Sequence, residues 1–356
     1  MPSDVSQPVP GLSAARNACA EWFGAAPVEV GPLSGPGFSG AAPTRVRPRG
    51  AAAWHVLKPF AAGTPRDRAE WIHGLARHLA DSGVAEVRRP LATPRGGTVV
   101  ADGRGVLWEM MPFVEGVATA SPGPARAAAA AAMLARVHVA AAALPGALPR
   151  PGRSAGAARR ISGARDLLAR SWRIRRESWA AGGAFAARLD RAIAIFETSR
   201  GDRAVAAVAA AREDDVTVQA VLRDVWSEHV LFAAADPPRV AGIVDLHAAG
   251  IDAPATDLAR MLGSWRRAGA ADANPLRTWP EAVAAYEGVR PLDEVERRLV
   301  PFLHAAGVVC GLDNWFRWTL DDGRTFPDAA TVRVDRLLED LPAALEWLAE
   351  RGPGRV

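Results

Sequence analysis

Two aspartates, Asp224 and Asp245, stand just after short apolar stretches in the central part of this 356-residue chain. The valine-rich run 216–221 precedes Asp224, and Ile243 and Val244 precede Asp245. Such β-branched runs predict short buried strands, so we expect both carboxylates to face one cleft from neighbouring strand ends. Phosphoryl transfer needs two carboxylates of this kind: one orients the attacking hydroxyl, and the other holds the metal ion on the nucleotide.

The residues around these aspartates resemble a known family. The segment LRDVWSEH resembles the kinase catalytic loop H-R-D-x-x-x-x-N, and GIVDLHAAG followed by DLARMLGSW resembles the pattern G-x-I-D-x…D-L-A. Together they resemble the aminoglycoside phosphotransferase and choline kinase group. The resemblance implies that Asp224 is the catalytic base, that Asp245 is the metal-holding aspartate, and that Asp257 is the aspartate of D-L-A.

Two positions depart from the family pattern. Leu222 stands where histidine is usual, and His229 stands where the asparagine that ligates a second metal is usual. Mg²⁺ prefers oxygen ligands, whereas imidazole suits Mn²⁺, iron or zinc. His229 is therefore either a metal ligand, with Mn²⁺ as an alternative to Mg²⁺, or a packed histidine. Asp257 is expected to be mainly structural, as a helix cap or loop anchor.

The only lysine among the 43 Lys and Arg residues is Lys58, in the strand-like segment WHVLKPF. The resemblance implies that this lysine reaches the α and β phosphates of ATP. About twenty residues earlier, Gly35, Gly37 and Gly40 could let backbone amides approach phosphates, although most such turns are ordinary hairpins. Glu70, on a helix expected over 65–82, resembles the acid that pairs with this lysine; the alternative is a surface charge.

A strand ending at Glu109–Pro112 resembles the hinge where backbone groups meet adenine, which includes Glu109 and Met111; the alternative is an ordinary strand end. The expected fold is α+β: a two-lobed protein-kinase-like fold with a small antiparallel-sheet lobe over 1–115 and a mostly helical lobe over 116–356. Apolar periodicity predicts helices over 12–23, 65–82, 124–143, 184–199, 279–287, 293–310 and 331–349.

The region 150–176 is rich in arginine. It is either a solvated helix face or a surface that touches nucleotide phosphates or an anionic substrate, and we do not expect a nucleic-acid partner because no stacking aromatic pattern accompanies it. Acids near the C-terminal end, such as Asp313 and Asp321, would attract a cationic acceptor unless they are turn residues.

Composition fits a folded protein of the reducing cytoplasm. Hydrophobic residues make up 49% of the chain, and its two cysteines, Cys19 and Cys310, lack metal-site spacing. No signal peptide or membrane span is expected, because charged residues interrupt the alanine-rich run 125–143. The expected function is ATP-dependent phosphoryl transfer to a hydroxyl of a small molecule that the sequence does not identify. A nucleotide-binding pseudokinase and an arginine-rich nucleic-acid-binding or scaffold protein are the alternatives.

Overall fold

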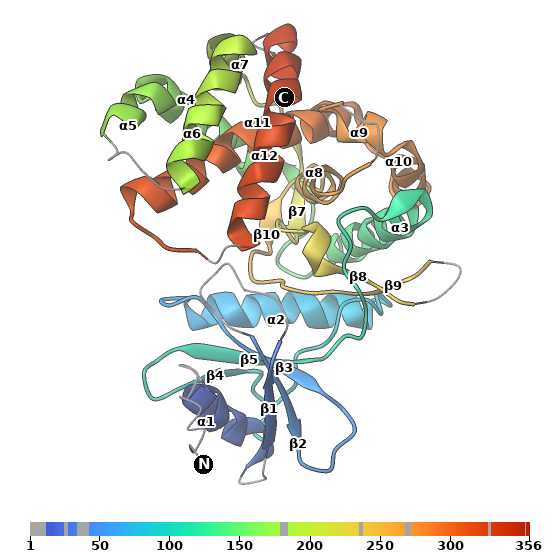
Figure 1. Ribbon diagram of the computed structural model, residues 1–356. Helices are drawn as coiled ribbons and strands as arrows, with labels where there is room; N and C mark the ends of the chain where they lie inside the picture. The colour runs from blue at the N-terminus through green and yellow to red at the C-terminus, as the bar shows by residue number, and fades with distance from the viewer. Residues whose placement is uncertain are drawn as a thin grey trace. The chain divides into compact units, whose positions relative to one another are not determined.

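The computed structural model describes residues 12–24, 28–33, 43–178, 184–234, 238–267, 272–326, 329–352 and 354–356. The chain divides into two compact units, Met1–Glu115 and Gly116–Val356, which Figure 1 shows coloured along the sequence. The architecture is α+β and two-lobed, as the sequence predicted, with antiparallel strands concentrated in the first unit and helices in the second.

The first unit is built on one antiparallel sheet with the strand order β1-β2-β3-β5-β4. Strand β5 thus lies inside the sheet, between β3 and β4. The strands are β1 (Val28–Pro32), β2 (Thr44–Pro48), β3 (His55–Pro59), β4 (Val99–Ala101) and β5 (Leu107–Pro112), and the helices are α1 (Leu12–Phe23) and α2 (Arg66–Asp81).

Local sequence accounts for the ends of these elements. Trp22 at the end of α1 is buried and donates its indole N–H to the carbonyl of Leu91 at 2.9 Å, which fastens the helix to the core of the unit. The β4–β5 hairpin turns at Asp102, whose carboxylate accepts the amides of Arg104 and Val106 and the Trp108 indole N–H. The prediction of a helix over 12–23 is confirmed.

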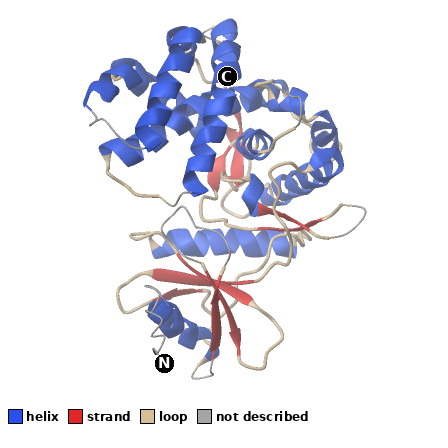
Figure 2. Cartoon of the chain, viewed as in Figure 1, coloured by secondary structure: helices blue, strands red, loops and turns tan. Residues whose placement is uncertain are grey.

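The second unit surrounds two small antiparallel sheets with helices (Figure 2). One sheet has the order β10-β7-β6, and the other pairs β8 with β9. The strands are β6 (Arg150–Gly152), β7 (Val216–Val221), β8 (Val230–Phe232), β9 (Val240–Ile243) and β10 (Gly250–Asp252). Because β7 and β9 belong to different sheets, the expectation that Asp224 and Asp245 follow neighbouring strands is wrong.

Most of the second unit is helical, and the expected helices are present. The prediction ended one helix near residue 310, but α11 continues to Phe316 and runs into a π-helical turn, because its apolar residues keep their helical spacing through Leu312 and Trp315. The helices are α3 (Gly123–Ala141), α4 (Ala155–Ala169), α5 (Trp172–Ser178), α6 (Ala184–Thr198), α7 (Gly201–Ala209), α8 (Ala255–Ser264), α9 (Pro275–Thr278), α10 (Pro280–Glu287), α11 (Glu294–Phe316) and α12 (Ala329–Arg351).

One helical segment of the described chain, Glu294–Asp321, has the length and apolar composition that a membrane crossing would need. Its most apolar part is 72% buried inside the protein. Asp293 and Glu296 form a reciprocal capping box at its start, each side chain accepting the other's backbone amide. The segment therefore packs as the central helix of the second unit.

Candidate active site

The loop after β7 carries Asp224 and is held in place from beneath by a buried carboxylate. Asp257, in the first turn of α8, is fully buried and accepts the backbone amides of Leu222 at 2.8 Å and Arg223 at 2.5 Å. Arg223 has a left-handed backbone with φ of 66°. A residue with a Cβ pays about 1–2 kcal/mol for that conformation, so the two hydrogen bonds to Asp257 are what hold the loop in it. The expectation that Asp257 is a loop anchor is confirmed.

A chain of hydrogen bonds supports Asp257 in turn. His138 on α3 binds the Asp257 carboxylate through Nε2 at 3.0 Å, and its Nδ1 lies 2.6 Å from the Tyr286 hydroxyl. Because a carboxylate only accepts, Nε2 is the protonated nitrogen of the neutral His138 ring, so Nδ1 accepts the hydrogen bond that the Tyr286 hydroxyl donates; Arg290 also donates to that hydroxyl. Burial is the main cause that raises the pKa of Tyr286, which keeps the phenol protonated for this bond. The loop position is thus set by groups from α3, α8 and α10.

His229 connects the two aspartates. It ends the short helical turn Ser227–His229, and its Nδ1 lies 2.7 Å from the backbone carbonyl of Asp224. A carbonyl oxygen only accepts hydrogen bonds, so Nδ1 must carry a proton and the neutral ring keeps its lone pair on Nε2. That Nε2 lies 3.9 Å from Oδ2 of Asp245. Nε2 of His229 therefore faces the carboxylate that the sequence predicts to be a metal ligand.

Backbone pairing brings Asp245 to this point. Val244 donates its amide to the His229 carbonyl at 2.9 Å, which extends the pairing of β8 with β9. Asp245 itself has a φ of 64°, a conformation that aspartate adopts more easily than most residues with a Cβ. Its side chain is 36% exposed and that of Asp224 is 38% exposed, so both carboxylates remain accessible to a ligand.

A cationic side chain lies beside Asp224. Nε of Arg260, on α8, is 3.7 Å from Oδ1 of Asp224, and its guanidinium stacks 4.7 Å from the centre of the Trp226 ring. Asp313, one of the acids that the sequence offered as attractants for a cationic acceptor, is buried and accepts from Arg175 at 2.5 Å and from the Trp172 indole at 3.0 Å. Positive rather than negative charge thus lies next to Asp224.

In the first unit, Lys58 lies on β3 directly opposite Glu109 of β5. Residues opposite each other in an antiparallel pair project from the same face of the sheet. Glu109 is buried there and binds Nε2 of His73 at 2.8 Å, while His73 Nδ1 binds Thr98. Lys58 therefore shares its face with a buried acid that is already positioned by α2.

Glu70 does not occupy the place that the sequence suggested. Its side chain is 57% exposed and pairs with Arg66 at 3.6 Å, one helical turn away. The buried stripe of α2 passes through Ala69, Ile72 and His73, so His73 is the polar residue that faces the sheet. Glu109 was expected at the hinge, but it lies in the sheet with strands paired on both sides, which leaves Met111 nearer the strand end.

The glycine-rich turn with Gly35, Gly37 and Gly40 lies outside the described residues. Sequence reasoning missed the roles of two residues: Glu109 lies opposite Lys58 on the same face of the sheet, and His73 binds Glu109. The signal was present in both cases: Glu109 is the one charged residue in the apolar strand LWEMM, and His73 follows the apolar stripe of its helix.

Known proteins share this fold and part of this sequence. A homoserine kinase from Methylobacterium nodulans is 30% identical over 232 residues, which span 65% of this chain and 63% of that protein, slightly less than two thirds of its length. A spectinomycin phosphotransferase solved with ADP and spectinomycin superposes with a TM-score of 0.62 at 11% identity, covering 97% of this chain and 100% of that one. An amicoumacin kinase solved with AMP-PNP and Ca²⁺ gives a TM-score of 0.58 at 11% identity, with 94% and 93% covered.

These two structures establish a shared fold, and the sequence match to a family goes further. Residues 39–292, more than half of the chain, match the phosphotransferase enzyme family, and they include Lys58, the loop of Asp224, and Asp245. The chain belongs to the phosphotransferase enzyme family.

Proposed function

We propose that this protein transfers the γ-phosphate of ATP to a hydroxyl of a small molecule. The observation that carries the proposal is the arrangement of the second unit, where His229 bonds to the backbone of Asp224 and its Nε2 faces Asp245. Membership of the phosphotransferase family and the ADP and AMP-PNP bound to the two fold neighbours support the choice of nucleotide.

Asp224 would orient the acceptor hydroxyl for in-line attack. Phosphoryl transfer proceeds mostly by positioning and charge stabilisation, so a fixed carboxylate contributes more through alignment than through basicity. The Asp257 anchor and the His229 bond fix the backbone on both sides of Asp224. The oxygen–phosphorus bond to the acceptor forms as the bond to the β–γ bridging oxygen breaks, ADP leaves, and the hydroxyl proton passes to Asp224.

Asp245 and His229 would hold the divalent ion. Nε2 of His229 and Oδ2 of Asp245 lie 3.9 Å apart, too far for a hydrogen bond, so both atoms would be available to an ion. No group of three or more acidic, histidine or cysteine side chains that could bind metal occurs among the described residues. A two-residue site fits Mg²⁺ or Mn²⁺ in this chemistry, because nucleotide phosphates and water supply the remaining ligands. When bound, the ion would neutralise charge on the phosphates.

The first unit would contribute the nucleotide contacts. Lys58 is assigned to the α and β phosphates, the turn with Gly35, Gly37 and Gly40 to close backbone approach, and the backbone at Met111 to adenine. Glu109 replaces Glu70 in our assignment as the acid that positions Lys58, because the register places it opposite the lysine. The proposed location is the cytoplasm, where Cys19 and Cys310 stay reduced; burial raises the pKa of each thiol to about 11, which keeps both unreactive.

A pseudokinase is the second candidate, and the specific observation in its favour is His229 at the asparagine position of the family pattern. Both candidates bind nucleotide, so only transfer separates them.

The test measures ATP binding by calorimetry and phosphate transfer over a panel of hydroxyl compounds, each with Mg²⁺, with Mn²⁺ and without metal. For the enzyme we expect metal-dependent ATP binding that is lost in Asp245→Asn, and transfer that falls by orders of magnitude in Asp224→Asn while ATP binding survives. Glu346→Gln, at an exposed position on α12, is the matched control. Undiminished transfer by Asp224→Asn would refute the role of Asp224, and nucleotide binding without transfer to any compound would favour the pseudokinase.

A further inference from the structure

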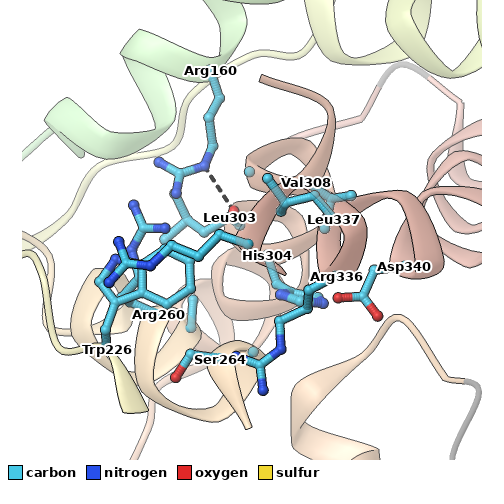
Figure 3. Close-up of a pocket in the computed structure, with 14 residues that line it drawn as sticks. Arg160, Trp226, Arg260, Ser264, Leu303, His304, Val308, Arg336, Leu337 and Asp340 are labelled. Atoms are coloured by element: carbon cyan, nitrogen blue, oxygen red, sulfur yellow. Dashed lines mark hydrogen bonds between the residues drawn. The ribbon is translucent and has the colours of Figure 1, made fainter. Parts of the chain in front are cut away.

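A hollow opens in the second unit, and its walls come from four helices and from the loop after β7 (Figure 3). Its cavity volume is about 40 Å³, room for a carboxylate-sized group or a few water molecules but not for a whole ligand. Trp226 forms one wall from the loop that carries Asp224. The other charged or polar residues of the lining are Arg160 on α4, Arg260 and Ser264 on α8, His304 on α11, and Arg333, Arg336 and Asp340 on α12.

The lining is strongly cationic, since it contains four arginines and one acid. That acid, Asp340, is already paired with Arg266, which lies outside the lining. Arg333 pairs with Glu228 at the edge of the hollow. Arg260 pairs with Asp224, which lies outside the lining, at 3.7 Å, so the lining itself holds more guanidiniums than carboxylates.

Arg160 shows this imbalance most clearly. Its Nε donates to the carbonyl of Leu303 at 2.7 Å and its Nη1 to the carbonyl of Gly156 at 2.9 Å, so its contacts are to groups without formal charge (Figure 3). Arg336 is half-buried; burial and then Arg266 lower its pKa, and the carboxylates of Asp340, Glu228 and Glu339 offset this only in part. Because burying unpaired charge destabilises a fold, the hollow would gain from an anion.

The titration behaviour of the hollow agrees with this excess of positive charge. Burial, followed by the repulsion of Arg160, Arg260 and Arg266, lowers the pKa of His304 to about 4. Burial also lowers the pKa of Arg160 to about 10, with Arg260 as the next cause. His304 is thus neutral at pH 7 and adds hydrogen-bonding capacity to the hollow without adding charge.

One side chain links the hollow to the reacting group. Arg260 lines it and also places its Nε 3.7 Å from Asp224, while its guanidinium stacks on Trp226. Arg333 lies 5.1 Å from the same ring. A ligand whose anionic group met these guanidiniums would need only a short carbon chain to bring a hydroxyl to Asp224.

We propose that the acceptor is a small hydroxyl compound that carries an anionic group, whose charge binds in the arginine-lined hollow while its hydroxyl reaches Asp224. This inference rests on the proposed phosphotransferase function and specifies its substrate class. Carboxylate and phosphate groups both match the forked donors of arginine. A polycationic acceptor would be repelled, because its amines would meet four arginines.

The test uses three probes of nearly equal length: 4-hydroxybutyrate, its neutral amide, and the cationic 4-aminobutanol. Binding is measured by calorimetry with and without saturating AMP-PNP and divalent metal, for the wild-type protein, Arg336→Gln, and Arg203→Gln at an exposed position on α7 as the control. We expect the acid to bind at least tenfold more tightly than the amide or the amine, and this preference to disappear in Arg336→Gln but not in Arg203→Gln.

Equal or tighter binding of the amide or the amine would overturn the inference, and so would the absence of binding by the acid at millimolar concentration. Competition between the acid and AMP-PNP would also overturn it, because the arginines would then serve the nucleotide phosphates. Failure of the inference differs from failure of the proposed function: in the first case phosphate transfer from ATP to another hydroxyl compound of the panel persists, and in the second no compound accepts phosphate.

Discussion

Replacing Asp257 by asparagine should weaken both the fold and the catalytic loop. The Asp257 carboxylate accepts three hydrogen bonds, from the amides of Leu222 and Arg223 and from Nε2 of His138. An asparagine of the same size offers one accepting oxygen, and its NH₂ group would point at a donor. At least one buried donor would lose its partner, and the backbone of Arg223 would lose part of what holds its positive φ.

The size of the effect follows from these bonds. A hydrogen bond to a charged group contributes roughly 1.5–3 kcal/mol, and a buried donor left without a partner costs about 1–3 kcal/mol. Loss of one or two of the three bonds therefore predicts a loss of about 3–5 kcal/mol in the free energy of unfolding, a large share of the roughly 5–15 kcal/mol typical of a native protein. We also expect transfer to fall by at least a hundredfold, because Asp224 would no longer be aligned.

Denaturant unfolding gives the stability change, and hydrogen exchange at Leu222 and Arg223 reports the loop directly. Asp202→Asn, at an exposed position on α7, is the control and should leave stability within about 0.5 kcal/mol of the wild type. Wild-type stability in Asp257→Asn, together with unchanged protection of the two amides, would refute the anchoring role.

Three other changes test separate parts of the site. His229→Asn should move the metal preference for ATP binding from Mn²⁺ toward Mg²⁺, because it replaces a nitrogen ligand with an oxygen ligand. If calorimetry gives an unchanged ratio of ATP affinities with Mn²⁺ and with Mg²⁺, His229 is not a ligand. Arg223→Gly should leave the free energy of unfolding within about 1 kcal/mol of the wild-type value, because relief of the positive φ offsets loss of the Arg223 hydrogen bond to the Ile251 carbonyl. A loss of stability above about 2 kcal/mol would contradict this balance. The pKa of His304 is lowered to about 4 in the folded protein, against about 6.5 in the unfolded chain. Its contribution to stability is therefore present above about pH 6.5 and is lost as the pH falls toward 4. The free energy of unfolding of His304→Gln should depend less on pH in that interval than that of the wild type, and an equal dependence would contradict the shift.

The sequence was sufficient for features that depend on local pattern. The spacing of Asp224, Asp245 and Asp257 located the loop after β7, the strand end that we propose faces the metal, and the anchor, because each follows or begins an element whose apolar period is strong. The isolated Lys58 stood out by composition alone. These predictions needed only the residue types and the lengths between them.

Pairing between distant segments could not be predicted in the same way. Glu70 and His73 lie on the same helix, and which of them faces the sheet depends on a rotation of the helix that the sequence constrains only through its apolar stripe. The arginines of region 150–176 look alike in sequence, yet Arg175 is buried against Asp313, Arg176 pairs with Asp190 at the surface, and Arg160 lines the hollow. Their separate roles depend on contacts more than a hundred residues away in two of the three cases.

The single lysine provides a last prediction, which separates charge from shape. Lys58→Arg keeps the positive charge, in a chain where every other Lys or Arg position already holds arginine. Glu109, opposite Lys58, is buried and accepts a hydrogen bond from His73 at 2.8 Å. A guanidinium at position 58 presents a rigid fork that matches a carboxylate, so it would compete with His73 for Glu109 instead of reaching toward phosphate as a flexible ammonium does.

We therefore expect Lys58→Arg to weaken ATP binding at least tenfold in calorimetry, close to the loss in Lys58→Met, while the melting temperature of Lys58→Arg stays within a few degrees of the wild type. Wild-type affinity in Lys58→Arg would show that positive charge alone suffices at this position, and Glu109 would then have no part in positioning the side chain.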